Sequence, residues 1–166
     1  MDRIVAEWAR EQPELDTSAI ALIGRVMRAS RLLQLDVERS LAMFELTVNE
    51  FNALNALRRA GPPHKLSPTD VGVSLLFSSG GLTKLLERLE SRGLVSREPN
   101  PDDGRGVMVA LTAAGKELQE DAMAAHQMNE ERLLTPLTRT QRDQLNAVLR
   151  DLLVTLEGGA ARVRSG

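Results

Sequence analysis

The fold is decided by residues 78–112, which read SSGGLTKLLERLESRGLVSREPNPDDGRGVMVALT. Four leucines in the first part recur at the spacing of one helix face, which predicts an amphipathic helix over 79–92. They are Leu82, Leu85, Leu86 and Leu89. Two short runs that favour strands follow, at 94–98 and 107–111, and the segment 99–106 between them consists of turn-forming residues. These runs therefore predict an antiparallel hairpin with a long tip.

Three helix starts carry capping signals, in which a hydroxyl covers a free backbone N–H and an acid or amide stands three residues on. The pairs are Thr47 with Glu50, Ser67 with Asp70, and Thr138 with Gln141. Together with the apolar periodicity, these signals predict further helices. Their expected ranges are about 48–60, 67–76, 113–134 and 139–157. The segment GPPHK that follows the first of these helices is predicted to be a connector.

The N-terminal part contains two further helical runs. Residues 2–12 place their apolar side chains on one face of a helix that ends at Pro13. The long segment 18–44 is predicted to form either two packed helical stretches or one long helix in an interface. At the other end of the chain, residues 158–166 are predicted to form a frayed tail.

The order of the central elements predicts a winged helix-turn-helix: helix 67–76, a two-residue turn, helix 79–92 and then the hairpin. In this motif the second helix lies in the DNA major groove, and the hairpin tip reaches the backbone or the minor groove. Lys84 and Arg88 stand one turn apart on the polar face of the second helix, and such like charges slightly destabilise a helix. A partner anion would explain the pair. The predicted fold class is therefore mainly α with a small β-hairpin wing.

The composition excludes several classes of protein. The 166 residues contain no Cys, no Tyr, two His, one Trp and three Phe. Without Cys there is no disulfide, no thiolate metal site and no Cys nucleophile, and two His are a poor set for acid–base catalysis. His64 and His126 do not form a cluster of metal ligands. We therefore expect neither an enzyme nor a metal or other cofactor, and the few aromatic residues argue against a stacking surface for single strands.

The distribution of charged and apolar residues limits where the protein is expected to act and which partners it is expected to have. No apolar run approaches the roughly 18 residues that a membrane span needs. The N-terminal residues are charged and lack the apolar core of a signal peptide. A net charge of -2 argues against a protein that coats nucleic acid indiscriminately. We expect a cytoplasmic protein of one domain that does not contact membranes.

Three motifs in the chain are typical of one family. They are LTKLLERLESRGLV at 82–95, the wing sequence DDGRG at 102–106, and LTAAG at 111–115. On these motifs the sequence resembles the MarR family of multiple-antibiotic-resistance-type regulators. The family pattern often has a second Arg where Gly104 stands, whereas this sequence keeps the acid and the Arg on either side of that glycine.

The resemblance implies a homodimer that binds a pseudo-palindromic operator in double-stranded DNA. It divides the single domain 1–166 into a helical dimerisation region at 1–46 and 113–157, a winged helix-turn-helix lobe at 47–112 and the tail at 158–166. Carried over residue by residue, it implies a set of DNA contacts. They are Ser67, Thr69, Ser78, Ser79, Gly80, Thr83, Lys84, Arg88, Asp103 and Arg105.

Particular roles within this set follow from the same resemblance. Arg105 would be the finger at the wing tip, held by Asp103, and Ser67 and Thr69 would touch phosphate. Glu87 departs from the pattern in charge. It would either accept a hydrogen bond from a cytosine amino group or face solvent.

A narrower resemblance is to the urate-responsive branch of the family, in which a Trp, an Asp and two Arg form a ligand pocket. Trp8 and Arg97 match the Trp and one Arg, while Asn52 stands at the acidic position and Leu85 at the other Arg position. The implied effector site is therefore Trp8, Asn52 and Arg97. Two ordinary alternatives remain, because Trp8 also suits a core or an interface and Arg97 also suits a pair with an acid nearby. We expect urate to bind weakly or not at all, since an unpaired buried charge costs several kcal/mol.

The function expected from the sequence is a ligand-responsive, DNA-binding transcriptional regulator. We expect a repressor that a small aromatic or anionic molecule releases from its operator. The alternative is a helical, dimeric protein-interaction module whose winged helix no longer binds DNA. Gly104 and Glu87 keep that alternative open.

Overall fold

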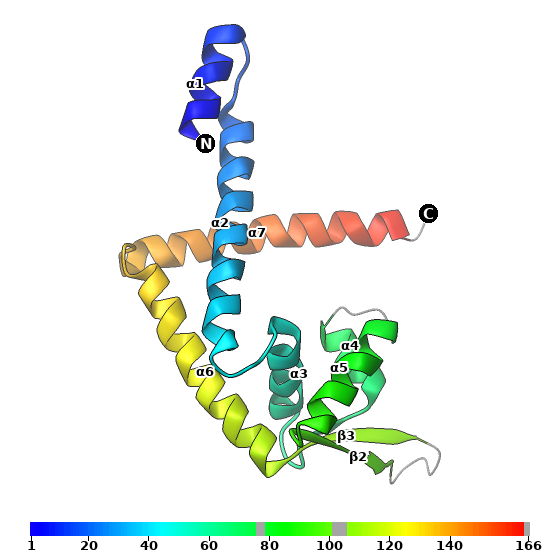
Figure 1. Cartoon of the computed structure of the whole chain (residues 1–166). Coiled ribbons are helices and arrows are strands. Elements are labelled where there is room, and N and C mark those ends of the chain that lie inside the picture. The colour runs from blue at the N-terminus through cyan, green and yellow to red at the C-terminus, as the bar shows by residue number, and fades with distance from the viewer. Residues whose placement is uncertain (76–78, 101–105, 165–166) are drawn as a thin grey trace. The chain divides into compact units, whose positions relative to one another are not determined.

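The computed structural model describes residues 1–75, 79–100 and 106–164 (Figure 1). The helices are α1 (Asp2–Glu11), α2 (Ser18–Ala42), α3 (Val48–Arg59), α4 (Pro68–Leu75), α5 (Ser79–Ser91), α6 (Ala113–Leu134) and α7 (Arg139–Arg164). The strands are β1 (Lys65–Leu66), β2 (Val95–Pro99) and β3 (Val107–Leu111). Two compact units, Met1–His126 and Gln127–Gly166, divide the chain, and α6 passes from one to the other. This mainly helical architecture with a small sheet confirms the predicted fold class.

The three predicted caps are present at the starts of α3, α4 and α7. Glu50 N donates to Thr47 Oγ1 at 3.2 Å, and Thr47 N donates to Glu50 Oε2 at 2.8 Å, which completes a capping box. The hydroxyls of Ser67 and Thr138 likewise accept from the backbone N–H three residues on, at 3.1 and 3.3 Å. Local side-chain chemistry therefore determines where these helices begin.

The sequence predicted the range of the long N-terminal helix better than that of the last helix. Of the segment 18–44, residues Ser18–Ala42 form one continuous helix, α2, so one long helix rather than two packed stretches is present. The predicted end of the last helix at 157 was too early, because α7 continues to Arg164. Gly158 does not stop this helix, since two alanines, which favour helix, follow the glycine pair and no proline is present there.

The predicted hairpin is confirmed as β2 and β3, which pair antiparallel from Val95 opposite Leu111 to Pro99 opposite Val107. The small strand β1 pairs with the other edge of β3, so the sheet order is β1-β3-β2. The sequence placed β1 in a connector, because two residues carry no periodic pattern. Its pairing depends on β3, which is more than forty residues away along the chain.

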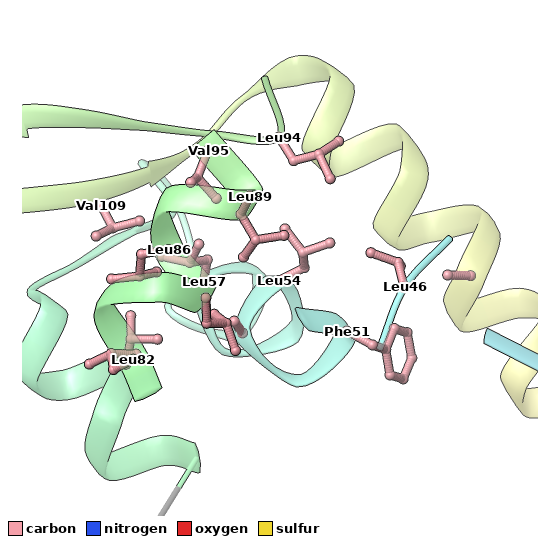
Figure 2. Close-up of a cluster of buried hydrophobic side chains, with 14 of the residues drawn as sticks. Leu46, Phe51, Leu54, Leu57, Leu82, Leu86, Leu89, Leu94, Val95 and Val109 are labelled. Atoms are coloured by element: carbon pink, nitrogen blue, oxygen red, sulfur yellow. The ribbon is translucent and has the colours of Figure 1, made fainter. Parts of the chain in front are cut away.

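The core of the winged lobe contains the predicted leucine stripe of α5 (Figure 2). The four leucines of that stripe are at most 9% exposed. They pack in one cluster with Leu54 and Leu57 of α3 and Val109 of β3, which are fully buried. Burial of each leucine is worth roughly 1.5–3 kcal/mol, so this stripe strongly favours one orientation of α5.

Helix α1 lies against the N-terminal half of α2. Arg25 Nη2 donates to Asp2 Oδ1 at 2.5 Å, and the guanidinium holds the pKa of the Asp2 carboxyl below its usual value. Gly24 provides room for the Met1 side chain, which a Cβ at that position would overlap. None of the α1 residues is fully buried. The contacts of Met1 and Asp2 at the N-terminal end of α1 therefore hold this helix against α2.

The LTAAG motif fastens the start of α6 to the start of β2. Thr112 Oγ1 donates to the Gly93 carbonyl at 2.7 Å and accepts from Gly115 N at 2.9 Å, which caps α6. Thr112 N donates to the Leu94 carbonyl at 3.1 Å. Gly115 is buried, and a Cβ there would overlap the Leu94 carbonyl oxygen. Glycine is therefore required by the close approach of two backbones.

Substitution of Gly115 by alanine tests this close approach. We expect Gly115→Ala to lower the free energy of unfolding by about 2–3 kcal/mol, because the Leu94 backbone must move to admit the methyl group. Urea denaturation followed by circular dichroism measures the change. The matched control is Gly158→Ala in α7, where a Cβ meets open space. It should raise the stability by up to about 1 kcal/mol through helix propensity. Equal effects of the two changes would contradict the close contact.

Candidate nucleic-acid interface

Helix α5 presents a polar face because its leucine face is committed to the core. Figure 1 shows α3, α4 and α5 grouped beside the β2–β3 hairpin. Thr83, Lys84, Glu87 and Arg88 are all exposed on α5. The free N–H groups and the positive dipole end at the start of a helix suit a phosphate. The first half of α5 therefore combines an exposed cation with a helix N-terminus.

The structure describes the other predicted DNA contacts only in part. Ser79 and Gly80 form the first turn of α5. Ser78, Asp103 and Arg105 lie outside the described residues. The base of the wing is closed where Asn100 N donates to the Gly106 carbonyl at 2.9 Å.

The start of α4 holds the two predicted phosphate contacts in different ways. Ser67 Oγ donates to Asp70 Oδ2 at 2.6 Å and accepts from Asp70 N at 3.1 Å. A phosphate accepts hydrogen bonds only, so it would compete with Asp70 for the single hydroxyl proton of Ser67. Thr69 is exposed beside this cap. The geometry therefore favours Thr69 over Ser67 as a donor to phosphate.

The anion that balances Arg88 belongs to the chain itself. Arg88 Nε lies 2.9 Å from Glu50 Oε1, and the Glu50 side chain is only 2% exposed. Sequence reasoning identified Glu50 solely as the acid of a capping box and assigned Arg88 to DNA. Nothing in the local pattern signals the ion pair, because its two residues belong to different helices and stand 38 positions apart in the chain.

Two further side chains anchor the second half of α5. Glu90 Oε2 pairs with Arg97 Nε of β2 at 3.0 Å. Beyond the last turn of α5, Arg92 donates to the carbonyls of Glu45 and Phe44 at 2.7 and 3.2 Å. These carbonyls follow the C-terminal end of α2. Sequence reasoning quoted Arg92 within a motif but gave it no role.

The predicted effector residues do not come together within one chain. Trp8 lies on α1, beside the half of α2 that holds Arg25, and α2 runs about 25 Å further before it reaches Ala42. Asn52 is exposed on α3, beyond that end of α2. Arg97 has the acidic partner that the ordinary alternative predicted.

Acidic side chains lie beside Trp8 and beside Arg97. A cavity of about 280 Å³ beside Trp8 is lined by Ile4, Glu7 and Glu11. Leu85, at the position of the second Arg, is buried in the core of the lobe. Among the described residues, the carboxylates of Glu7 and Glu11 line the cavity beside Trp8, and Arg3 Nε pairs with Glu7 Oε1 at 3.5 Å.

In residues 1–75, 79–100 and 106–164, no helix is long and apolar enough to cross a membrane. Within the same ranges, no three His, Asp or Glu side chains gather in a group that could hold a metal ion.

Comparisons with known proteins agree on one family. The MarR family model matches residues 44–106. The regulator PecS of Dickeya dadantii is 33% identical over 146 residues, which cover 88% of each chain. A crystal structure of a mutant E. coli MarR complexed with operator DNA has a TM-score of 0.70 and 29% identity, and covers 82% of this chain and 97% of that one. AbsC, a MarR family transcriptional regulator from Streptomyces coelicolor, has a TM-score of 0.74 and 26% identity, with 87% and 97% covered.

Proposed function

The chain belongs to the MarR family of DNA-binding transcriptional regulators, and we propose that it works as a homodimeric repressor released from its operator by a small aromatic molecule. The observation that carries this proposal is the division of α5. Its leucine face and its second half are tied to the lobe, whereas Thr83 and Lys84 in its first half are exposed. We therefore prefer a DNA reader to an interaction module.

In this proposal the first half of α5 enters the major groove, and the wing reaches the backbone or the minor groove. Thr83 and Lys84 are exposed where that contact requires them, and Thr69 at the start of α4 suits a phosphate. The other proposed contacts are Ser67, Ser78, Ser79, Gly80, Asp103 and Arg105. The related MarR that was crystallised with operator DNA supports operator DNA as the partner.

The proposal of a homodimer rests on apolar side chains that one chain leaves exposed. In α2 only Ala21 and Leu41 are buried. Large apolar side chains that are at least 37% exposed on this helix are Ile20, Leu22, Ile23, Met27, Leu32, Leu33 and Leu35. Helix α7 exposes Leu145, Val148, Leu153, Val154 and Leu156. Exposed apolar side chains in such number mark an interaction surface, so a second copy is the occupant that fits a family of symmetric DNA readers.

The proposed effector is a neutral or singly charged aromatic compound. It would stack on Trp8, whose side chain is 40% exposed, and bond to Asn52 and Arg97. Since α2 separates Trp8 from the lobe of the same chain, the site would combine Trp8 of one protomer with the lobe of its partner. Glu11 beside Trp8, and Glu90 beside Arg97, disfavour an anion such as urate.

Substitutions of Lys84 and Arg105 test the DNA contacts. Lys84→Ala and Arg105→Ala should each weaken operator binding and reduce the slope of log K against log salt concentration by about 2, since each removes two phosphate contacts per dimer. Binding to a labelled DNA duplex selected from a randomised pool gives both quantities. Lys116→Ala on α6 is the control, and its slope should equal that of the wild type. Unchanged affinity and slope in both variants would remove the proposed contacts.

A charge in the apolar face of α7 tests the dimer. Leu145→Glu should dissociate the protein, because the interface would have to bury an unpaired carboxylate. Light scattering at micromolar concentration measures the mass. Arg150→Glu places the same charge at an exposed position of α7 that already carries a charge, and it should leave the dimer intact. A monomeric mass for the wild-type chain would end this proposal.

Titration of the protein–DNA complex tests the class of effector. We expect urate to leave the complex intact at micromolar concentration, since the lost charged hydrogen bonds reduce affinity by roughly ten- to a hundredfold. Fluorescence anisotropy of the labelled duplex reports release. In a panel of neutral aromatic compounds, those that release the DNA should fail to do so with Trp8→Leu. Release by low micromolar urate would show that the pocket has been wrongly assigned.

A further inference from the structure

The carboxylate of Glu50 divides its two oxygens between two helices. Oε2 accepts from Thr47 N and Thr47 Oγ1, both at 2.8 Å, and so closes the capping box of α3. Oε1 faces Arg88 Nε of α5 at 2.9 Å. Oε1 is buried and makes no hydrogen bond of good geometry with any described residue, so the charge of Arg88 is its stabilising partner.

Burial makes this pair selective for one position of α5. Glu50 is 2% exposed, whereas the side chain of Arg88 is 58% exposed. A buried carboxylate is strongly unfavourable once its partner is removed. Rotation of α5 about its axis would carry Arg88 away from Oε1. The pair therefore acts together with the leucine face in favouring one rotational setting of the helix.

Two further contacts, near the C-terminal end of α5, also favour one rotational setting of the helix. Glu90 pairs with Arg97 on β2, and Arg92 donates to the carbonyls that follow α2. The three side chains fasten the helix to α3, to the sheet and to the turn after α2. The exposed pair in the first half, Thr83 and Lys84, lies on the same rigid helix. The contacts at the C-terminal end of the helix therefore set the direction in which Thr83 and Lys84 point.

We propose that Arg88 is a positioning residue, held by Glu50, that sets the rotation of α5 and so aims Thr83 and Lys84 at DNA. This inference rests on the proposed function, in which α5 reads the major groove. It replaces the expectation that Arg88 itself contacts DNA. The two roles for Arg88, positioning residue and DNA contact, predict opposite effects on DNA binding when the charge of Glu50 is removed. If Glu50 merely competed with DNA for Arg88, removing its charge would strengthen binding, whereas a positioning pair requires that charge.

The variant that separates them is Glu50→Gln. Gln is an accepted residue at this place in a capping box, so the variant keeps an acceptor for Thr47 and loses the charge that faces Arg88. We expect binding to the selected duplex to weaken by about tenfold, with the salt slope unchanged. Glu117→Gln on α6 removes an exposed acid and should bind like the wild type. Binding by Glu50→Gln that is as tight as or tighter than wild type would overturn the proposal.

Arg88→Ala supplies the second readout. As a positioning residue it should weaken binding to a similar degree without reducing the salt slope, and the double variant with Glu50→Gln should be no weaker than either single variant. A slope reduced by about 2 would make Arg88 a phosphate contact and overturn the proposal. Circular dichroism and light scattering confirm that each variant is folded and assembled. If Arg88→Ala does not fold, Glu50→Gln alone decides.

Lys84→Ala keeps this test distinct from that of the proposed function. If Lys84→Ala leaves both affinity and slope unchanged, α5 is not the reading helix and the proposed function fails. If Lys84→Ala lowers the slope while Glu50→Gln binds normally, α5 reads DNA but the positioning role of Arg88 is wrong.

Discussion

Burial of one face of α5 is the constraint on which the rest of the lobe depends. Once the leucines enter the cluster with α3 and β3, the period of the helix requires Thr83 and Lys84 to face outward. Burial of the leucines decides which face of α5 points inward, because the hydrophobic contribution is large, although it is non-directional. Charged groups then refine the setting, since the Glu50–Arg88 pair and the Glu90–Arg97 pair depend on distance and angle.

The parts of the fold that the sequence predicted are those that local chemistry determines. Thr47, Ser67 and Thr138 cap helices through partners three residues away, and the strands of the hairpin are close neighbours in the chain. The parts that it did not predict depend on distant partners. Strand β1 exists because β3 lies beside it, and the length of α7 reflects a glycine pair that the following alanines outweigh.

The candidate site shows the same division between local and distant determinants. The exposed positions on α5 follow from periodicity, so Thr83 and Lys84 were predictable as surface residues. The state of Arg88 was not, because its partner Glu50 had already been explained by its cap. Arg92 shows how far such links reach. Its two hydrogen bonds to the carbonyls of Phe44 and Glu45 give the end of α2 and the end of α5 a shared anchor. A displacement of the end of α2 therefore acts directly on the end of α5.

The position of Trp8 determines what optical spectroscopy of this protein reports. The chain has one Trp and no Tyr, so its intrinsic fluorescence comes almost entirely from a half-exposed indole on α1. Helix α1 is tethered to α2 through Asp2 and Arg25, on the side of α2 remote from the lobe. Emission therefore follows the docking of α1 and the occupation of the cavity beside it. The winged lobe itself contains no Trp or Tyr, so its unfolding is best followed by the helical circular dichroism or by an introduced fluorophore.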